Sequence, residues 1–269
     1  MTGFLIYDDE GIKRNRWFAD ELTQKAQKHG VDLQLKIRCD EQLYCFETPD
    51  FVIVRTISPN TNLCFEQRGI PVFNNYKTSR CANNKWLTYL LANKLKIPVM
   101  RTLLPSGDKP GTVYPFILKS LNGHGGNEVF MVHNDCEYNA LAHAYEDNFL
   151  IQEVCSDVGK DVRVYCLGER IVAAILRTSS SDFRSNFSLG GSATVFTPTE
   201  SMVKTVKLLH NELNFSLAGV DFISHNGSWI LNEIEDVVGT RMLYQCTSID
   251  IANEYMQHIV KSITSKNEA

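Results

Sequence analysis

Several common signatures are missing from this 269-residue sequence. Its eight cysteines include no C-x-x-C pair, which argues against a zinc site, and their scatter is typical of reduced thiols in a cytosolic protein. No apolar run approaches the ~20 residues that span a membrane. The N-terminus, M-T-G-F-L-I-Y-D-D-E-G, lacks a basic start and is interpreted as a strand rather than a signal peptide. We therefore expect a cytoplasmic protein with no membrane partner.

Strong positive charge and two widespread glycine motifs are missing as well. The net charge is −4 and no block of lysine or arginine stands out, which argues against a nucleic-acid partner. The sequence has neither G-x-G-x-x-G nor a Walker loop, so a Rossmann or P-loop nucleotide site has no support. Apolar content of 43% and charged content of 22% are ordinary globular values. Whether the protein forms a homo-oligomer is left open.

The pattern of apolar and turn residues changes along the chain and predicts an α/β (α+β) protein of two domains. The first ~75 residues alternate short apolar strands with helical periodicity, which predicts a small parallel sheet with helices on its faces. Strands joined by short turns follow from Pro115 onward. We predict an N-terminal domain at 1–76 and a second domain at 77–269, the latter with a small lobe at about 100–155 and a C-terminal lobe at about 156–269.

Apolar periodicity and turn residues predict the individual helices and strands. The apolar stripe through Trp86, Leu90 and Leu95 predicts one helix over Lys77–Lys96. The segment Thr102–Tyr114 contains two prolines and two glycines and is predicted to be a loop or linker. The predicted strands are Phe4–Tyr7, Val31–Ile37, Phe51–Arg55, Ile70–Phe73, Phe116–Lys119, Glu128–Val132, Phe149–Glu153, Asp161–Leu167, Arg170–Arg177, Leu217–Ile223 and Trp229–Ile234. The other predicted helices are Arg14–His29, Thr61–Arg68, Cys136–Asp147, Glu200–Leu213 and Ile249–Ser262.

An acidic β-hairpin is the most informative motif. Two apolar runs flank the turn S-H-N-G, and they carry Asp221 on the first strand and Glu233 and Glu235 on the second. Glu233 and Glu235 are two residues apart and point to the same face, where Asp221 can lie opposite them. Three converging carboxylates favour a divalent cation such as magnesium. The alternative is that they form the solvated face of the hairpin.

A glycine-rich loop follows a strand that ends in Lys119. The loop S-L-N-G-H-G-G-N-E contains Gly123, Gly125 and Gly126, and small residues let backbone N–H groups approach an anion. A lysine at the end of an apolar strand needs an anionic partner, either a phosphate or a nearby carboxylate. Lys85 could supply a second ammonium group, although on its own it is an ordinary helix-surface lysine.

Two further segments could contribute to the same site. The apolar strand that ends at Gln152, Glu153 and Val154 could offer its backbone to a base edge. The polar loop Ser179–Gly191 carries Arg184, which could clamp a carboxylate or phosphate, and Asn186, which could hydrogen-bond a ligand or lie beside a metal ion. The alternative for this loop is a solvated Ser/Gly-rich segment.

In this order, the motifs resemble the ATP-grasp superfamily and its RimK-like branch of carboxylate–amine ligases. They are Asn84-Lys85, P-F-I-L-K-S-L-N-G-H-G-G, I-Q-E-V, D-V-R-V-Y, D-F-R-S-N-F-S-L-G-G, A-G-V-D-F and N-E-I-E-D-V-V-G. The resemblance covers about Phe73 to Val260, and the segment before it looks like the small domain that precedes the grasp in the same family. It implies an ATP-grasp fold with a small parallel-sheet N-terminal domain.

The resemblance also implies roles for individual residues. Lys85 and Lys119 would hold the phosphates of ATP, and the loop at Gly123–Gly126 would close over them. Gln152, Glu153 and Val154 would meet the adenine. The remaining implied ligands are Asp161 for the ribose, Arg184, Ser185 and Asn186 at the reacting centre, and Asp221, Glu233 and Glu235 for magnesium or manganese. Three arginines are further candidates for substrate contacts: Arg55, Arg163 and Arg241.

One position departs from the family pattern. Where RimK-like sequences have Glu-x-Asn, this chain has Glu233-Ile234-Glu235. The additional carboxylate could tighten metal binding, favour a different divalent ion, or turn outward. The implied activity is an ATP-dependent ligation of a carboxylic acid to an amine through an acyl phosphate, with an amino acid and a peptide, protein or small amine as substrates. The alternative is a regulatory or scaffolding protein that binds a nucleotide without ligation.

Overall fold

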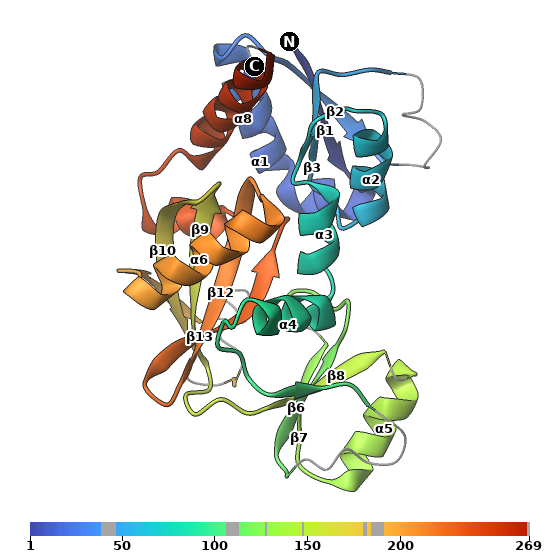
Figure 1. The fold of residues 1–269 in the computed structure, drawn as a ribbon, viewed down its shortest axis with the longest axis vertical. Helices are drawn as coiled ribbons and strands as arrows, with labels where there is room; N and C mark the ends of the chain where they lie inside the picture. Colours follow the sequence, from blue (N-terminus) through green and yellow to red (C-terminus); the bar gives the residue numbers. More distant parts are fainter. Residues whose placement is uncertain are drawn as a thin grey trace.

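The computed structural model describes residues 1–38, 47–105, 113–126, 128–146, 148–179, 182–183 and 191–267. Three β-sheets follow one another along the long axis of the molecule (Figure 1). The N-terminal sheet lies at one end, the sheet of the C-terminal lobe in the middle and the sheet of the small lobe at the other end. The predicted α/β class with an ATP-grasp arrangement is confirmed.

The N-terminal sheet is parallel, in the order β2-β1-β3-β4. Its central strands β1 and β3 are buried nearly throughout, since helices cover a parallel sheet on both faces and its strands read as continuous apolar runs. The strands are β1 (Thr2–Tyr7), β2 (Asp32–Ile37), β3 (Phe51–Val54) and β4 (Val72–Phe73), and the helices are α1 (Asp9–Lys28) and α2 (Pro59–Gln67).

The predicted single helix over Lys77–Lys96 is wrong. The structure has two helices, α3 (Tyr76–Ala82) and α4 (Lys85–Lys94), which connect the N-terminal end of the molecule to the small lobe (Figure 1). Asn84 separates them because its side chain accepts a hydrogen bond from the Leu87 backbone at 3.0 Å and caps α4. Apolar periodicity does not indicate such a cap, because the apolar stripe continues on the other side of the break. The break places Lys85 in the first turn of α4.

The small lobe contains a four-stranded antiparallel sheet in the order β5-β8-β6-β7. The predicted loop over Thr102–Tyr114 is wrong at its start, because Thr102 and Leu103 pair with β8 as an edge strand. The other elements are β6 (Phe116–Ser120), β7 (Val129–Val132), α5 (Asp135–Tyr145) and β8 (Phe149–Glu153).

The C-terminal lobe contains a five-stranded antiparallel sheet in the order β11-β10-β9-β12-β13. The sequence pattern missed β11 and α7, and it ended the last helix too early. The elements are β9 (Lys160–Leu167), β10 (Arg170–Thr178), β11 (Ser192–Phe196), α6 (Glu200–Leu213), β12 (Leu217–His225), β13 (Ser228–Glu235), α7 (Arg241–Cys246) and α8 (Ile251–Asn267).

One hydrophobic core joins the N-terminal sheet to the C-terminal lobe. Leu5 and Phe18 belong to the same buried cluster as Leu217 and Tyr255. The Asn74 side chain reinforces this junction, since it donates hydrogen bonds to the carbonyls of Leu217 at 2.8 Å and Asp236 at 2.9 Å. Within the described part of the chain, none of the helices combines the length and apolar character needed to cross a membrane.

Candidate active site

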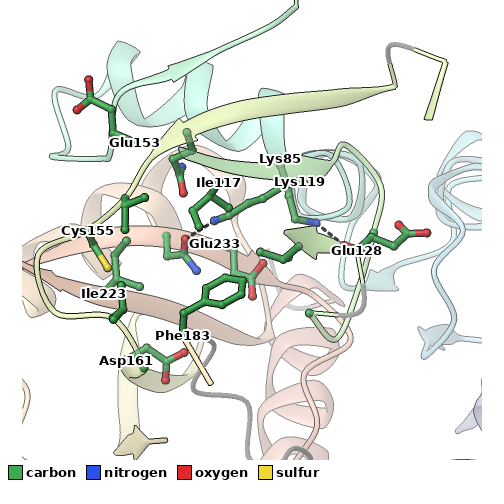
Figure 2. A pocket seen from close by; sticks show the side chains of 18 of the residues that line it. Lys85, Ile117, Lys119, Glu128, Glu153, Cys155, Asp161, Phe183, Ile223 and Glu233 are labelled. Atoms are coloured by element: carbon green, nitrogen blue, oxygen red, sulfur yellow. Dashed lines mark hydrogen bonds between the residues drawn. The ribbon is translucent and has the colours of Figure 1, made fainter. Parts of the chain in front are cut away.

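A cavity lies between the sheet of the small lobe and the sheet of the C-terminal lobe (Figure 2). Strands β6 and β8 contribute one wall, and β9, β12 and β13 contribute the other. The structure brings together here the described residues that were predicted to bind ATP: Lys85, Lys119, Gly123, Gly125, Gly126, Gln152, Glu153, Val154 and Asp161. Ser185 lies outside the described residues, as do Arg184 and Asn186.

Lys119 projects from β6 into this cavity and reaches the opposite lobe. Its ammonium donates a hydrogen bond to Oδ1 of Asn232 on β13 at 3.0 Å. The pKa of Lys119 falls to about 8, mainly because of burial; Glu233 opposes this shift and the nearby Lys85 adds to it. A lysine whose charge is disfavoured in this way gains from a bound anion, which restores the charged form.

Lys85 ties the first turn of α4 to the glycine-rich loop. Its ammonium donates a hydrogen bond to the carbonyl of Gly123, and its backbone N–H donates to the carbonyl of Leu121 at 3.0 Å. Gly123 is tightly enclosed, because a Cβ atom there would lie 2.3 Å from Oε2 of Glu128 and 3.2 Å from Cβ of Ser120. At Gly123 the loop therefore lines the cavity with backbone atoms and no side chain.

The apolar part of the lining was not identified from the sequence. Ile117 on β6 and Ile223 on β12 line the cavity from opposite lobes, and Phe183 lines it as well (Figure 2). Such a slot accommodates a flat ring, with Glu153 and Val154 at its edge. The two isoleucines lie in predicted strands, but this does not distinguish a cavity wall from a core, because isoleucines in strands ordinarily belong to a core.

The three predicted metal-binding carboxylates converge. One oxygen from each of Asp221, Glu233 and Glu235 lies within 4.8 Å of the others. Antiparallel pairing explains the geometry, since Asp221 pairs with Glu233, and Gly219 with Glu235. Of the three, Glu233 alone lines the cavity, and its carboxylate has no hydrogen bond or ion pair to another described residue.

The other two carboxylates belong to an ionic network that the sequence analysis did not foresee. Arg163 on β9 donates to both oxygens of Asp221, at 2.8 and 2.7 Å, and to Oε1 of Glu235 at 2.6 Å. Arg177 on β10 donates to Oδ2 of Asp221 at 2.8 Å and to both oxygens of Asp161 at 2.6 Å. Arg177 ends the apolar run A-A-I-L-R, which is the same signal that singled out Lys119.

These contacts set the charges of the network. Burial by itself raises the pKa of Asp221, but Arg163 and Arg177 hold it at about 2, so the group is ionised. Burial raises the pKa of Glu235 to about 7, with Arg163 opposing the shift. Asp161 lines the cavity, but its pairing with Arg177 means that a ribose there would share an already bonded carboxylate.

None of the three arginines predicted to contact substrate lines the cavity: Arg163 belongs to the ionic network, and the other two lie elsewhere. Arg55 is buried beneath the segment after β13, where it donates to the carbonyl of Val238 at 2.8 Å and stacks 5.2 Å from the ring centroid of Phe18. Arg241 begins α7 and donates to the carbonyl of Arg14. Neither residue lines the cavity between the two lobes.

Comparison with known proteins agrees with this geometry. Residues 82–259 match the family model described as a RimK-like ATP-grasp domain. A probable alpha-L-glutamate ligase of Haemophilus ducreyi is 26% identical over 212 residues, which cover 73% of this chain and 68% of that protein. The alpha-aminoadipate–LysW ligase LysX of Saccharolobus solfataricus is 26% identical over 247 residues, covering 82% and 89%. The D-alanine–D-alanine ligase of Bacillus anthracis, solved with ATP, superposes with a TM-score of 0.78 at 14% identity and full coverage of both chains.

The chain belongs to the RimK-like ATP-grasp family. It is accordingly an ATP-dependent ligase that forms a C–N bond between a carboxylate and an amine. The D-alanine–D-alanine ligase supports the fold alone, because its sequence identity is low.

Proposed function

We propose that the cavity between the two lobes binds ATP in one orientation. Its triphosphate lies between Lys85, Lys119 and the glycine-rich loop, and its adenine lies in the slot between Ile117 and Ile223. The observation that carries this proposal is the Lys119 ammonium, which is part-buried in the cavity and reaches across to the lobe that bears Glu233. Two ammonium groups in such a place favour a bound phosphate, whose negative charge they would neutralise.

The residues present fit a divalent cation of the magnesium type. Glu233 offers unshared oxygens toward the cavity, and Asp221 retains one lone pair on Oδ1, because its three hydrogen bonds use the remaining three of its four acceptor positions. Magnesium is commonly held by one or two carboxylates together with substrate phosphates. When bound there, it would neutralise charge on the transferring phosphoryl group.

The chain's own residues would act mainly by positioning and charge neutralisation. A carboxylate oxygen of the acid substrate attacks the γ-phosphorus of ATP, the bond to ADP breaks, and an acyl phosphate forms. The amine then attacks the acyl carbon, phosphate leaves, and the nitrogen loses a proton to give an amide. Lys85 and Lys119 would hold the phosphates in line for the first step. The glycine-rich loop would keep water from the acyl phosphate.

An amino acid is the proposed acid or amine, joined to a peptide, a protein or a small amine. The names of the two relatives support this choice, because both name an amino acid as a substrate of a ligase. Arg184, Ser185 and Asn186, which lie outside the described residues, stay predictions for the reacting centre.

Hydroxylamine provides the test, because it traps an acyl phosphate as a hydroxamate. The purified protein would be incubated with ATP, magnesium, hydroxylamine and, in turn, each member of a panel of amino acids and peptides, and both ADP and hydroxamate would be measured. We expect equal amounts of the two products with at least one acid. ATP binding without ADP release across the panel would indicate a nucleotide-binding module, and ADP without hydroxamate would indicate a stable phosphorylated product.

Glu233→Gln is the matched variant for this assay. The change keeps the size of the side chain and removes the only carboxylate of the trio that faces the cavity. We expect turnover to be lost while the thermal unfolding midpoint stays within about 2 °C of the unmodified protein, since a part-buried group without partners contributes little to folding. Full activity in this variant would contradict the metal role.

A further inference from the structure

Glu235 occupies the position where the chain departs from its family pattern, and its surroundings assign it a role. We infer that Glu235 is a positioning residue that anchors Arg163, and that it is not a ligand of the divalent ion. The ion is held through Glu233, with Asp221 behind it, and the second carboxylate of the Glu-x-Glu pair is neutralised by a guanidinium. This inference rests on the proposed function of the cavity.

The contacts of Arg163 are the first step. One nitrogen, Nη2, lies 2.7 Å from Oδ2 of Asp221 and 2.6 Å from Oε1 of Glu235, so the guanidinium bridges the two carboxylates. A dication bound by the same two carboxylates would lie against a fixed positive charge. Repulsion between cations a few ångströms apart is strong where water is excluded. The bridge therefore takes the place of an ion between Asp221 and Glu235.

Arg163 cannot easily leave this position. Its side chain is only 10% exposed and extends from a central strand of the five-stranded sheet. Gly219, on the neighbouring strand, lies beside the stem, where a Cβ atom would be in ordinary contact with Cδ of Arg163 at 3.6 Å and would clash with Cγ2 of Val238 at 2.7 Å. Removing the guanidinium would leave the part-buried Glu235 without this partner and the buried Asp221 with Arg177 alone, which is unfavourable.

The lining of the cavity is the second, independent step. Glu233 lines the nucleotide cavity and also the smaller adjoining pocket beside Lys85 and Lys119. Asp221 is fully buried, and Glu235 lines neither space. An ion that also contacts phosphates in the cavity therefore meets Glu233 first. A single facing carboxylate is sufficient for an ion that takes its other ligands from phosphates and water.

Manganese binding tests the inference without reference to turnover. The protein would be saturated with a non-hydrolysable ATP analogue, and free Mn²⁺ would be counted by electron paramagnetic resonance. We expect Glu233→Gln to weaken Mn²⁺ binding by about tenfold or more, the scale of losing a group that supports a metal site. We expect Glu235→Gln, which is isosteric, to change the affinity by less than about threefold. Glu10→Gln, on the exposed first turn of α1, is the matched control.

Arg163→Met supplies a readout that a purely structural role would not affect. Loss of the guanidinium removes a positive charge and releases Glu235, so Mn²⁺ should bind more tightly by about threefold or more. The double variant Arg163→Met/Glu235→Gln should lose that gain. If Arg163→Met does not fold, the comparison of Glu233→Gln with Glu235→Gln decides the question.

Each outcome has one meaning. Equal weakening by Glu233→Gln and Glu235→Gln would make Glu235 an ion ligand and overturn the inference, while the proposed function would stand. Nucleotide binding is measured in parallel samples that lack the ATP analogue, with a fluorescent ADP analogue. If the unmodified protein binds no nucleotide, the proposed function is wrong and this inference is wrong with it.

Discussion

The surroundings of Lys119 indicate which kind of ligand the cavity binds. The Lys119 ammonium, near the end of an apolar strand, is part-buried, and in this structure its described partner is the neutral Asn232. Its charge is consequently disfavoured, and its pKa falls to about 8. The sequence pattern alone identified Lys119, because a charged residue at the end of an apolar strand is conspicuous, whereas Lys85 was assigned to the phosphates through the family resemblance.

Replacing Lys119 should weaken ATP binding. A charge-assisted hydrogen bond contributes about 1.5–3 kcal/mol, so Lys119→Met is expected to lower the affinity for ATP by about tenfold or more. Isothermal titration with the non-hydrolysable analogue measures it. Lys13→Met, at an exposed ion pair on α1, is the control and should leave the affinity unchanged. An unaltered affinity in Lys119→Met would mean that the phosphates lie elsewhere.

The pKa of Lys119 also predicts a pH dependence. In the free protein the group loses its proton above about pH 8, whereas bound phosphates raise its pKa toward or above the ordinary value of 10.5. ATP binding should therefore take up about 0.9 of a proton at pH 9 but only about 0.1 at pH 7, and the affinity should fall as the pH rises above 8. Titrations in two buffers of different ionisation enthalpy measure the uptake.

Lys119→Met is the control for this uptake. ATP and other groups of the site also exchange protons, and they do so in both proteins. The difference between the two proteins therefore reports Lys119. Identical proton uptake at pH 9 would show that this lysine is not the group that phosphate recharges.

At the scale of elements, the site depends on how a loop and a strand pair are built. The glycine-rich loop is held from one side by the Lys85 ammonium and from the other by Glu128, whose carboxylate lies where a side chain on Gly123 would project. The antiparallel register of β12 and β13 then places Glu233 opposite Asp221. Neither arrangement needs a contact from the far end of the chain.

Gly123→Ala should disturb the loop without unfolding the protein. The added Cβ would lie 3.0 Å from Cβ of Glu128, so the loop must shift by a few tenths of an ångström. We expect a loss of ATP affinity of about three- to tenfold, because phosphate contacts by backbone N–H groups depend on close approach. Fluorescence titration with an ATP analogue checks the affinity, and a thermal melt checks the fold. Unchanged affinity would separate this loop from phosphate binding.

At the scale of the whole molecule, the N-terminal sheet and the C-terminal lobe fold against each other. Leu5 and Phe18 share a core with Leu217 and Tyr255, and Asn74 hydrogen-bonds the backbone of the C-terminal lobe. The division between 1–76 and 77–269 stays a prediction about domains. The shared core nevertheless bears on whether the two parts are stable when separated.

A fragment of residues 77–269 should not fold cooperatively. Removing the N-terminal part would expose the buried faces of Leu217 and Tyr255, and each large side chain left exposed loses about 1.5–3 kcal/mol of burial free energy. Circular dichroism during heating should show a broad, low-amplitude transition, whereas the full chain should unfold sharply. A sharp transition in the fragment would mean that the C-terminal part is stable by itself.

The sequence by itself determined the elements and chemistry that depend on neighbouring residues. Strand and helix periodicity, the glycine-rich loop, the acidic hairpin with Asp221 and Glu233, and the conspicuous Lys119 all lie within short segments. Their order along the chain was enough to indicate the family. The helix break at Asn84 and the edge strand at Thr102 were missed, because a cap and a two-residue pairing leave little periodic signal.

Only the tertiary structure decided which charges face the cavity and which neutralise one another. Arg163, Arg177, Asp161, Asp221 and Glu235 come from four strands, and a sequence does not state which of them will meet across a sheet. Ion pairing depends on distances of a few ångströms, and these are set by strand order and register. For that reason Glu233 and Glu235, two residues apart and on the same face, have different surroundings.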